Sequence, residues 1–186
     1  MKTVKAQVKE DLLKTLTELF RENGYDGASL SRIMEATGLV KASLYHRFAG
    51  GKEEMAEAVL DRTSQTFAGD LLAPLSAPGE PSERLAQTAA RLKKFYRSGG
   101  LPCLLDTLTL NSNNQGIRRR ARGALQYWID TFAAFARECG HPPATARRRA
   151  EDAIAALEGG LVLARVSGNR QPFLRALESL PERLMQ

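Results

Sequence analysis

Polar side chains that could bind another molecule are concentrated between residues 29 and 48. This stretch reads Ser-Leu-Ser-Arg-Ile-Met-Glu-Ala-Thr-Gly-Leu-Val-Lys-Ala-Ser-Leu-Tyr-His-Arg-Phe. Its spacing predicts two short helices separated by a turn at Gly38, and the second helix directs Leu44 and Phe48 inward at i, i+4. The opposite face of that helix then carries small, hydroxyl and hydrogen-bonding groups, which suit the major groove of double-stranded DNA. The pattern is typical of a DNA-reading helix-turn-helix.

Four side chains in and just after this stretch are candidates for contacts with DNA phosphates. Lys41 at the start of the second helix and Lys52 beyond it offer ammonium groups, and Tyr45 offers a hydroxyl donor. Ser29 is placed to cap the first helix of the motif or to meet a phosphate there, and the two roles are compatible. As structural alternatives, Lys41 would be solvated and the ring of Tyr45 would pack against the first helix of the chain.

Base edges are expected to be read by other residues of the same motif. Arg32, Ser43 and His46 carry groups that match the hydrogen-bonding pattern of bases in the major groove, and Ala42 and Val40 can touch thymine methyl groups. For Arg32 the alternative is again a solvated side chain. The candidate DNA-binding set is Ser29, Arg32, Lys41, Ala42, Ser43, Tyr45, His46 and Lys52.

An ordered string of residues in this region resembles the TetR family of transcriptional regulators. It comprises Gly24-Tyr25, Ala28-Ser29, the run Leu44-Tyr45-His46-Arg47-Phe48, and Lys52 at the start of the next helix. The resemblance is detailed over roughly residues 8 to 60 and rests on helix layout beyond them. The stretches Gly-Gly-Leu-Pro-Cys and Glu-Gly-Gly-Leu-Val-Leu-Ala-Arg further resemble the LmrA/YxaF-type subgroup. Ala28 and Val40 depart from the family pattern, which usually has hydroxyl residues there.

The resemblance implies a homodimer on a palindromic operator, because one such domain contacts only a few base pairs. The two reading helices would lie about one turn of DNA apart, ~34 Å. It also implies repression rather than activation. A small, mostly apolar effector in a C-terminal bundle would release the DNA, with a coupling free energy of ~1–3 kcal/mol. The alternative is a DNA-binding dimer without an effector, which would lack a cavity around Trp128.

Helical periodicity continues through the rest of the chain and predicts an all-α fold. We expect a three-helix DNA-binding domain over 1–51 and a helical ligand-binding and dimerisation domain over 52–186. No run of β-branched residues with a period of two is present. The expected helices cover residues 4–23, 29–37, 40–48, 52–73, 82–97, 102–111, 115–139, 144–167 and 172–184.

Aromatic residues gather around the only tryptophan of the sequence. Trp128 and Phe132 lie on or beside the apolar stripe of the helix expected over 115–139. An ordinary core would explain them, and so would a pocket that encloses an apolar ligand within a helical bundle. The candidate pocket residues are Phe95, Tyr96, Leu104, Leu105, Leu108, Tyr127, Trp128 and Phe132.

Small and large apolar residues alternate along 146–164. Gly159-Gly160 costs about 1 kcal/mol of helix stability per glycine relative to alanine, so close packing against another helix is expected to compensate. By similarity to the family, the last two long helices would meet those of a second copy, and the alternative is an intramolecular core. The candidate dimer residues are Ala153, Leu157, Gly160, Leu161, Ala164, Phe173, Leu177 and Leu180.

A net charge of +6 is consistent with a polyanionic partner. The arginine clusters at 118–122 and 147–149 would be solvated helix faces or a second nucleic-acid surface. Cys103 and Cys139 lack partners at metal-ligand spacing, so we expect buried free thiols rather than a redox switch, with no metal and no cofactor.

The sequence also limits the class and location of the protein. No apolar run of ~18 residues is present, and the N-terminus is too charged for a signal peptide, which predicts a cytoplasmic protein without a membrane partner. His46 and His141 are the only histidines, and neither lies in a nucleophile, phosphate-loop or metal motif. An all-α enzyme is therefore a remote alternative.

Overall fold

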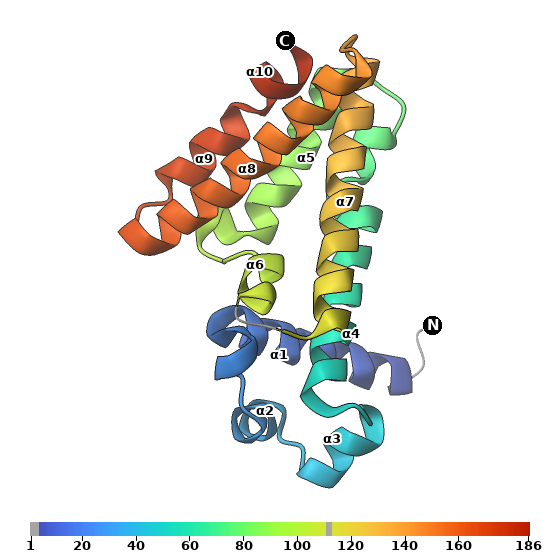
Figure 1. The fold of residues 1–186 in the computed structure, drawn as a ribbon, viewed down its shortest axis with the longest axis vertical. Helices are drawn as coiled ribbons and strands as arrows, with labels where there is room; N and C mark the ends of the chain where they lie inside the picture. The colour runs from blue at the N-terminus through green and yellow to red at the C-terminus, as the bar shows by residue number, and fades with distance from the viewer. Residues whose placement is uncertain (1–3, 111–112) are drawn as a thin grey trace. The chain divides into compact units, whose positions relative to one another are not determined.

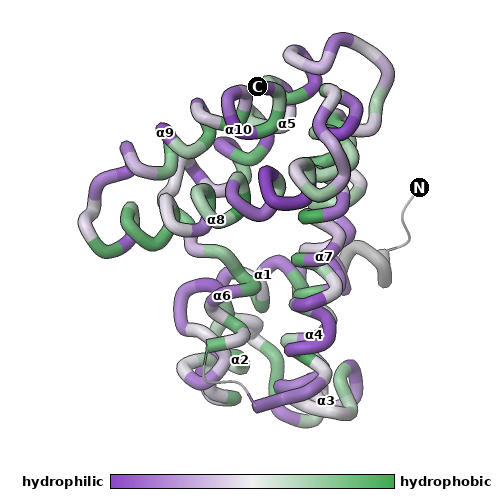
Figure 2. The backbone as a smooth tube through the Cα atoms, turned by 45° about the horizontal axis from the view of Figure 1, so that its top comes forward, coloured by the Kyte–Doolittle hydropathy of each residue, from purple (hydrophilic) through white to green (hydrophobic). Residues whose placement is uncertain are grey.

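The computed structural model describes residues 4–110 and 113–186, with side chains from residue 9 onward, and every regular element in this part of the chain is a helix (Figure 1). The all-α prediction is confirmed. The helices are α1 (Val4–Gly27), α2 (Leu30–Thr37), α3 (Lys41–Arg47), α4 (Gly51–Thr66), α5 (Pro81–Phe95), α6 (Leu104–Thr109), α7 (Gln115–Glu138), α8 (Pro143–Ser167), α9 (Gln171–Glu178) and α10 (Leu180–Met185), with short π or 3₁₀ segments η1 (Phe67–Leu71), η2 (Ala73–Ser76) and η3 (Arg97–Gly99). Figure 2 shows hydrophobic and hydrophilic residues alternating along these helices, as amphipathic elements require.

Two of the expected helices are interrupted. The helix expected over 52–73 is α-helical only to Thr66 and continues as the π-helical turn η1. The helix expected over 172–184 is two helices, α9 and α10, joined at Ser179. Periodicity of side chains does not reveal such breaks, because π turns and short kinks preserve the inward direction of most apolar residues.

The chain divides into two compact units. Unit 1 contains the described residues up to Ser64 together with those between Leu104 and Arg122, and unit 2 contains 65–103 and 123–186. The division therefore falls after Ser64 rather than after residue 51. Helix α6 and the first turns of α7 belong with the N-terminal helices, because they pack against α1 and its core.

The core of unit 1 is built from the inward faces of its helices. Leu16 and Phe20 of α1, Ile33 of α2 and Leu44 of α3 are fully buried, and Phe48 closes the same cluster. This burial confirms the predicted inward pair of α3. Gly38 adopts a left-handed conformation (φ 67°) and donates its N–H to the Met34 carbonyl at 2.9 Å, which ends α2 and allows the tight turn into α3.

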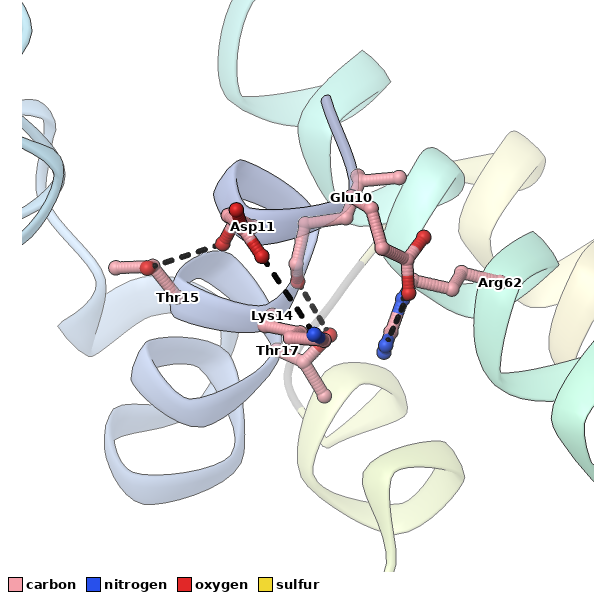
Figure 3. Close-up of polar contacts among 7 residues, drawn as sticks. Glu10, Asp11, Lys14, Thr15, Thr17 and Arg62 are labelled. Carbon is pink, nitrogen blue, oxygen red and sulfur yellow. Dashed lines mark hydrogen bonds and ion pairs between the residues drawn. The ribbon is translucent and has the colours of Figure 1, made fainter. Parts of the chain in front are cut away.

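Polar contacts also hold α1 to α4 within unit 1. Figure 3 shows Glu10 of α1 facing Arg62 of α4, and Glu10 Oε1 accepts from Arg62 Nε at 2.9 Å and Nη2 at 2.7 Å. Both side chains are largely shielded from solvent. Because such a guanidinium–carboxylate contact has a fixed direction, it helps to set the position of α4 on α1.

The core of unit 2 includes a very close approach of α8 and α9. A Cβ added at Gly160 would lie 2.8 Å from the Phe173 Cα, so only glycine permits this spacing. Phe173 is fully buried. The compensation expected for Gly160 is therefore present within one chain, where α8 packs on α9, whereas a Cβ at Gly159 would meet no atom of the described residues within 4 Å.

A second anchor in unit 2 is the guanidinium of Arg84 in α5. It donates to Glu138 Oε1 at 2.7 Å and Oε2 at 2.6 Å and to the Leu75 carbonyl at 2.8 Å. Its centre lies 5.3 Å from the Phe135 ring centroid. The Arg84 side chain is buried, whereas Glu138 is about half exposed. Hydrogen bonding by Arg84 lowers the pKa of the Glu138 carboxyl below its ordinary value of 4.5.

This lowered pKa makes the stability of unit 2 depend on pH. A carboxyl with a depressed folded-state pKa contributes stability above its unfolded value, and the contribution is lost as pH falls below about 4.5. We expect Glu138→Gln to lower the melting temperature at pH 7, and the difference from wild type to shrink toward pH 3. Glu151→Gln is the matched control, since Glu151 forms an exposed ion pair with Arg147 at 3.0 Å. A difference that stayed constant from pH 7 to pH 3 would contradict this account.

Candidate nucleic-acid interface, pocket and subunit surface

The start of α2 places two of the candidate DNA-binding residues. Ser29 is exposed, and its Oγ accepts from the Arg32 N–H at 3.3 Å, so the capping role is present. The guanidinium of Arg32 donates to the side chain of Asn23 and, at 3.4 Å, to the carbonyl of Gly27. Arg32 is thus held against the end of α1 while its side chain remains exposed.

The outward face of α3 carries the side chains expected there. Lys41, Ala42, Tyr45 and His46 are exposed, and Ser43 is half-buried. They project from a seven-residue helix whose inner face is anchored in the core, so their positions are set by buried contacts rather than by the helix alone. The arrangement offers one cation, one phenol hydroxyl, one imidazole and a methyl group to a common partner.

Tyr45 packs beside the start of α4. Its hydroxyl would lie 3.4 Å from a Cβ added at Gly51, a residue with φ +63°, so the glycine leaves room for the phenol. The Lys41 Nζ is 5.8 Å from the Tyr45 ring centroid, within range of a weak cation–π contact. Tyr45 remains 42% exposed, and its ring lies at the start of α4.

Lys52 has an internal partner in unit 1. Its Nζ donates to the Tyr25 carbonyl at 3.0 Å and lies 4.2 Å from the Tyr25 ring centroid. Burial raises the pKa of the Tyr25 phenol, and Glu53 and Asp26 raise it further, so this ring stays neutral at physiological pH. The ammonium expected to neutralise a phosphate is therefore directed at the end of α1 in the unbound protein.

Sequence reasoning passed over Arg47, the last residue of α3. Arg47 is exposed, and its Nη1 donates to the Ser43 carbonyl at 3.1 Å. It adds a second cation to the same short helix as Lys41. The signal was available in the Leu-Tyr-His-Arg-Phe run, since the position before an inward Phe48 faces outward on a helix.

The internal role of Lys52 has a measurable consequence. We expect Lys52→Ala to lower the stability of unit 1 by about 1 kcal/mol, the net value of one hydrogen bond. The salt slope of DNA binding should fall by less than the ~0.9 expected for a fully lost phosphate contact, because the Tyr25 carbonyl holds the ammonium in the unbound protein. Thermal unfolding and DNA titration over a range of salt concentrations measure both quantities. If the salt slope of the variant fell by about 0.9, Lys52 would instead be a full phosphate contact in the DNA complex.

A small apolar cavity lies inside unit 2, with a volume of about 20 Å³. Three of the candidate pocket residues, Tyr96, Trp128 and Phe132, line it. The complete lining is Phe67, Leu72, Leu92, Tyr96, Trp128, Phe132, Ile154, Leu157, Glu158 and Leu161. Phe67, which the sequence did not suggest, stacks on Trp128 with ring centroids 4.1 Å apart and an angle of 17° between the planes.

The other candidate pocket residues lie elsewhere, and their assignment is corrected. Leu104, Leu105 and Leu108 pack in the core of unit 1. Tyr127 is exposed on α7, and Phe95 packs edge-on against Phe67 rather than lining the cavity. The leucines were misplaced because α6 lies in the chain between the two segments of unit 2, yet it packs on α1 of unit 1. Local periodicity cannot reveal such a long-range contact.

The candidate dimer residues are also corrected. Every member of the set Ala153, Leu157, Gly160, Leu161, Ala164, Phe173, Leu177 and Leu180 is buried within a single chain. They pack in the intramolecular core that was the alternative interpretation, although Gly160 also lines a surface hollow. The large apolar residues of α8 that do reach solvent are Val162, Leu163 and Val166, and the last two are 57% and 78% exposed.

These three residues are here called the α8 strip, and Leu163 among them lines a surface hollow of about 430 Å³. The hollow is lined by Gly159, Leu163, Pro172 and Arg175, among others. A Cβ added at Gly159 would meet no atom within 4 Å among the described residues. The α8 strip is therefore an open apolar face that a second helix could approach closely.

Two family models match this chain. Residues 12–59 match the model described as "Bacterial regulatory proteins, tetR family", and residues 81–179 match "Transcriptional regulator LmrA/YxaF-like, C-terminal domain". The second match covers more than half of the sequence. The chain belongs to the TetR family. Both the family and the LmrA/YxaF-like subgroup expected from the sequence are thereby confirmed.

Relatives of this TetR-family chain match over nearly its whole length. The HTH-type transcriptional regulator LmrA of Bacillus subtilis is 25% identical over 180 residues, covering 95% of this chain and 96% of LmrA. The HTH-type transcriptional repressor DhaR of Mycobacterium sp. strain GP1 is 24% identical, covering 96% of this chain and 92% of DhaR. A TetR regulator from Legionella pneumophila superimposes with a TM-score of 0.85 at 22% identity, covering 95% of this chain and 96% of that one. The reduced form of NemR from Escherichia coli superimposes with a TM-score of 0.77 at 21% identity, covering 95% of this chain and 97% of NemR.

TetR-family membership determines the general activity. The protein is a DNA-binding transcriptional regulator and not an enzyme, as the sequence predicted. Within the residues that the structure describes, no helix is both long and apolar enough to cross a membrane, and no cluster of three or more potential metal ligands occurs.

Proposed function

We propose that this TetR-family regulator is a cytoplasmic repressor that binds a palindromic operator as a homodimer and leaves it when a small, mostly apolar effector binds unit 2. The observation that carries the DNA-binding part is the outward face of α3. Lys41, Tyr45 and His46 share this face, and Arg47 adds a second cation at its end. Cations supply affinity through phosphates, while the imidazole and small side chains supply base recognition.

The homodimer is supported by the α8 strip and by the small size of the reading helix. Three exposed apolar residues in one helix turn and a half form a patch that favours association. A twofold interface would place the strip of one copy against the same strip of the other. Seven residues of α3 contact few base pairs, so two linked copies are needed for a selective site.

Repression follows from where such a dimer would bind, because an occupied operator blocks access to the promoter. The relative DhaR is named a repressor, which favours the same sign of regulation here. The effector is supported by the apolar cavity beside Trp128 in unit 2. Without an effector, the protein would be a constitutive DNA-binding dimer and this cavity would serve only packing.

The operator proposal is tested by selecting genomic DNA fragments that the purified protein retains and sequencing them. We expect an inverted repeat whose half-site centres are about 10 base pairs apart or a multiple of this. If the retained fragments shared no inverted repeat, the proposed palindromic operator would be contradicted. If they shared a single unrepeated half-site, the proposed binding as a homodimer would be contradicted.

A further inference from the structure

The cavity in unit 2 is too small for an effector as it stands. Its volume of about 20 Å³ accommodates roughly one water molecule. Protein sites for small organic ligands usually measure about 300–1,000 Å³. A ligand can enter only if a wall side chain moves out and gives up its own volume.

Phe67 lies outside the long regular helices that carry most of the wall, as do Leu72 and Tyr96, and it is the member of this group that stacks on Trp128. It begins the π-helical turn η1, which a 3₁₀ segment follows, whereas Trp128, Phe132 and Leu157 lie inside the long helices α7 and α8. π turns interrupt regular hydrogen bonding and occur frequently at functional sites. Phe67 is nonetheless 97% buried, since its ring fills the space over the Trp128 face.

Trp128 lines the cavity and carries a buried polar atom. Its Nε1 is buried and finds no acceptor among residues 4–110 and 113–186. A buried indole N–H normally donates to an acceptor, so an unpaired one beside a cavity indicates where a ligand oxygen or nitrogen would bind. The side chain is 95% buried and lines the cavity directly.

We propose that Phe67 occupies the effector site of the unliganded protein and that the effector takes its place. The ligand would be a small molecule whose apolar ring fills the volume that Phe67 vacates beside Trp128 and whose hydrogen-bond acceptor receives the Nε1–H at the edge of the indole. This inference rests on the proposed effector-binding function and specifies its site. Phe67 directly follows Thr66, the last residue of α4, so its displacement acts on the end of that helix.

Phe67→Ala tests the proposal by emptying the site. The probes are acetophenone, which has a ring and a carbonyl acceptor, and α-methylstyrene, which has the same shape without the acceptor. We expect both to raise the melting temperature of Phe67→Ala. Because Trp128 is the only tryptophan, a ¹⁵N-labelled sample gives one indole N–H signal, which acetophenone alone should shift downfield. Wild type should bind acetophenone more weakly than the variant.

Failure to stabilise the variant with either probe, or equal indole shifts from both, would overturn the proposal. Phe95→Ala is the matched control, because Phe95 contacts Phe67 edge-on but lies outside the cavity wall, and it should gain no probe binding. If Phe67→Ala does not fold, Phe67→Leu is expected to show the same preference with weaker binding. DNA retention is measured on the same samples. If the wild-type protein retained no DNA, the proposed function would be refuted, whereas the ligand site would still be supported by the probe binding.

Discussion

A monomer with greatly weakened operator binding is the expected product of Leu163→Arg combined with Val166→Arg. Both positions are among the most exposed apolar side chains of unit 2, so the chain should fold normally. Two arginines on each α8 strip would face two more across the twofold axis, and the like charges would oppose association. Losing the second half-site removes the gain from linked binding, about 10²–10⁴-fold in affinity.

Analytical ultracentrifugation and operator titration measure the two effects together. Leu125→Arg provides the control, since Leu125 is an exposed leucine on α7 outside the α8 strip. It should leave both the dimer and operator affinity intact. A double variant that remained dimeric would show that the copies associate through another surface. A monomeric variant with unchanged operator affinity would show that dimerisation is not part of DNA recognition.

His46→Ala is expected to weaken operator binding and to relax the preference at one base position in each half-site. The imidazole is exposed on the outward face of α3. Loss of one specific base contact costs about 1–3 kcal/mol per half-site, or roughly 5- to 150-fold. Titration of the variant with the selected operator and with single-base variants of it measures both affinity and preference.

Lys41→Ala is the matched comparison on the same helix. Removing a phosphate contact should weaken binding to all sequences alike and reduce the salt slope by about 0.9 per lost contact. His46→Ala should leave that slope unchanged. If His46→Ala lost affinity equally for every sequence, the imidazole would be a phosphate contact rather than a base reader.

The helix-turn-helix was predictable because its signals are local. Glycine at a left-handed turn, an inward i, i+4 pair and a capping serine are determined by residues within about ten positions of one another, and the structure has Gly38, Leu44 and Ser29 in these roles. Lys52 shows the limit of the same reasoning. Its position in the motif was clear, but the partner of its ammonium, the carbonyl of Tyr25, lies 27 residues away in the chain.

In unit 2 the periodicity identified which side chains turn inward but not which neighbours they meet. The stripe of α8 is buried as its pattern indicates, yet it is buried against α9 of the same chain and around the cavity rather than against a second copy. An apolar stripe has the same spacing in an interface as in a core. Only the exposed α8 strip distinguishes the two, and exposure depends on the tertiary packing.

The sequence by itself determined the helical class, the DNA-reading motif and the family, since these depend on residue type and short-range spacing. Tertiary structure alone decided that α6 belongs with the N-terminal helices and that Phe67 stacks on Trp128. It also decided which face of α8 remains open to a partner. The physical reason is that burial and pairing are properties of contacts between segments distant in the chain, and many such pairings are compatible with one pattern of apolar residues.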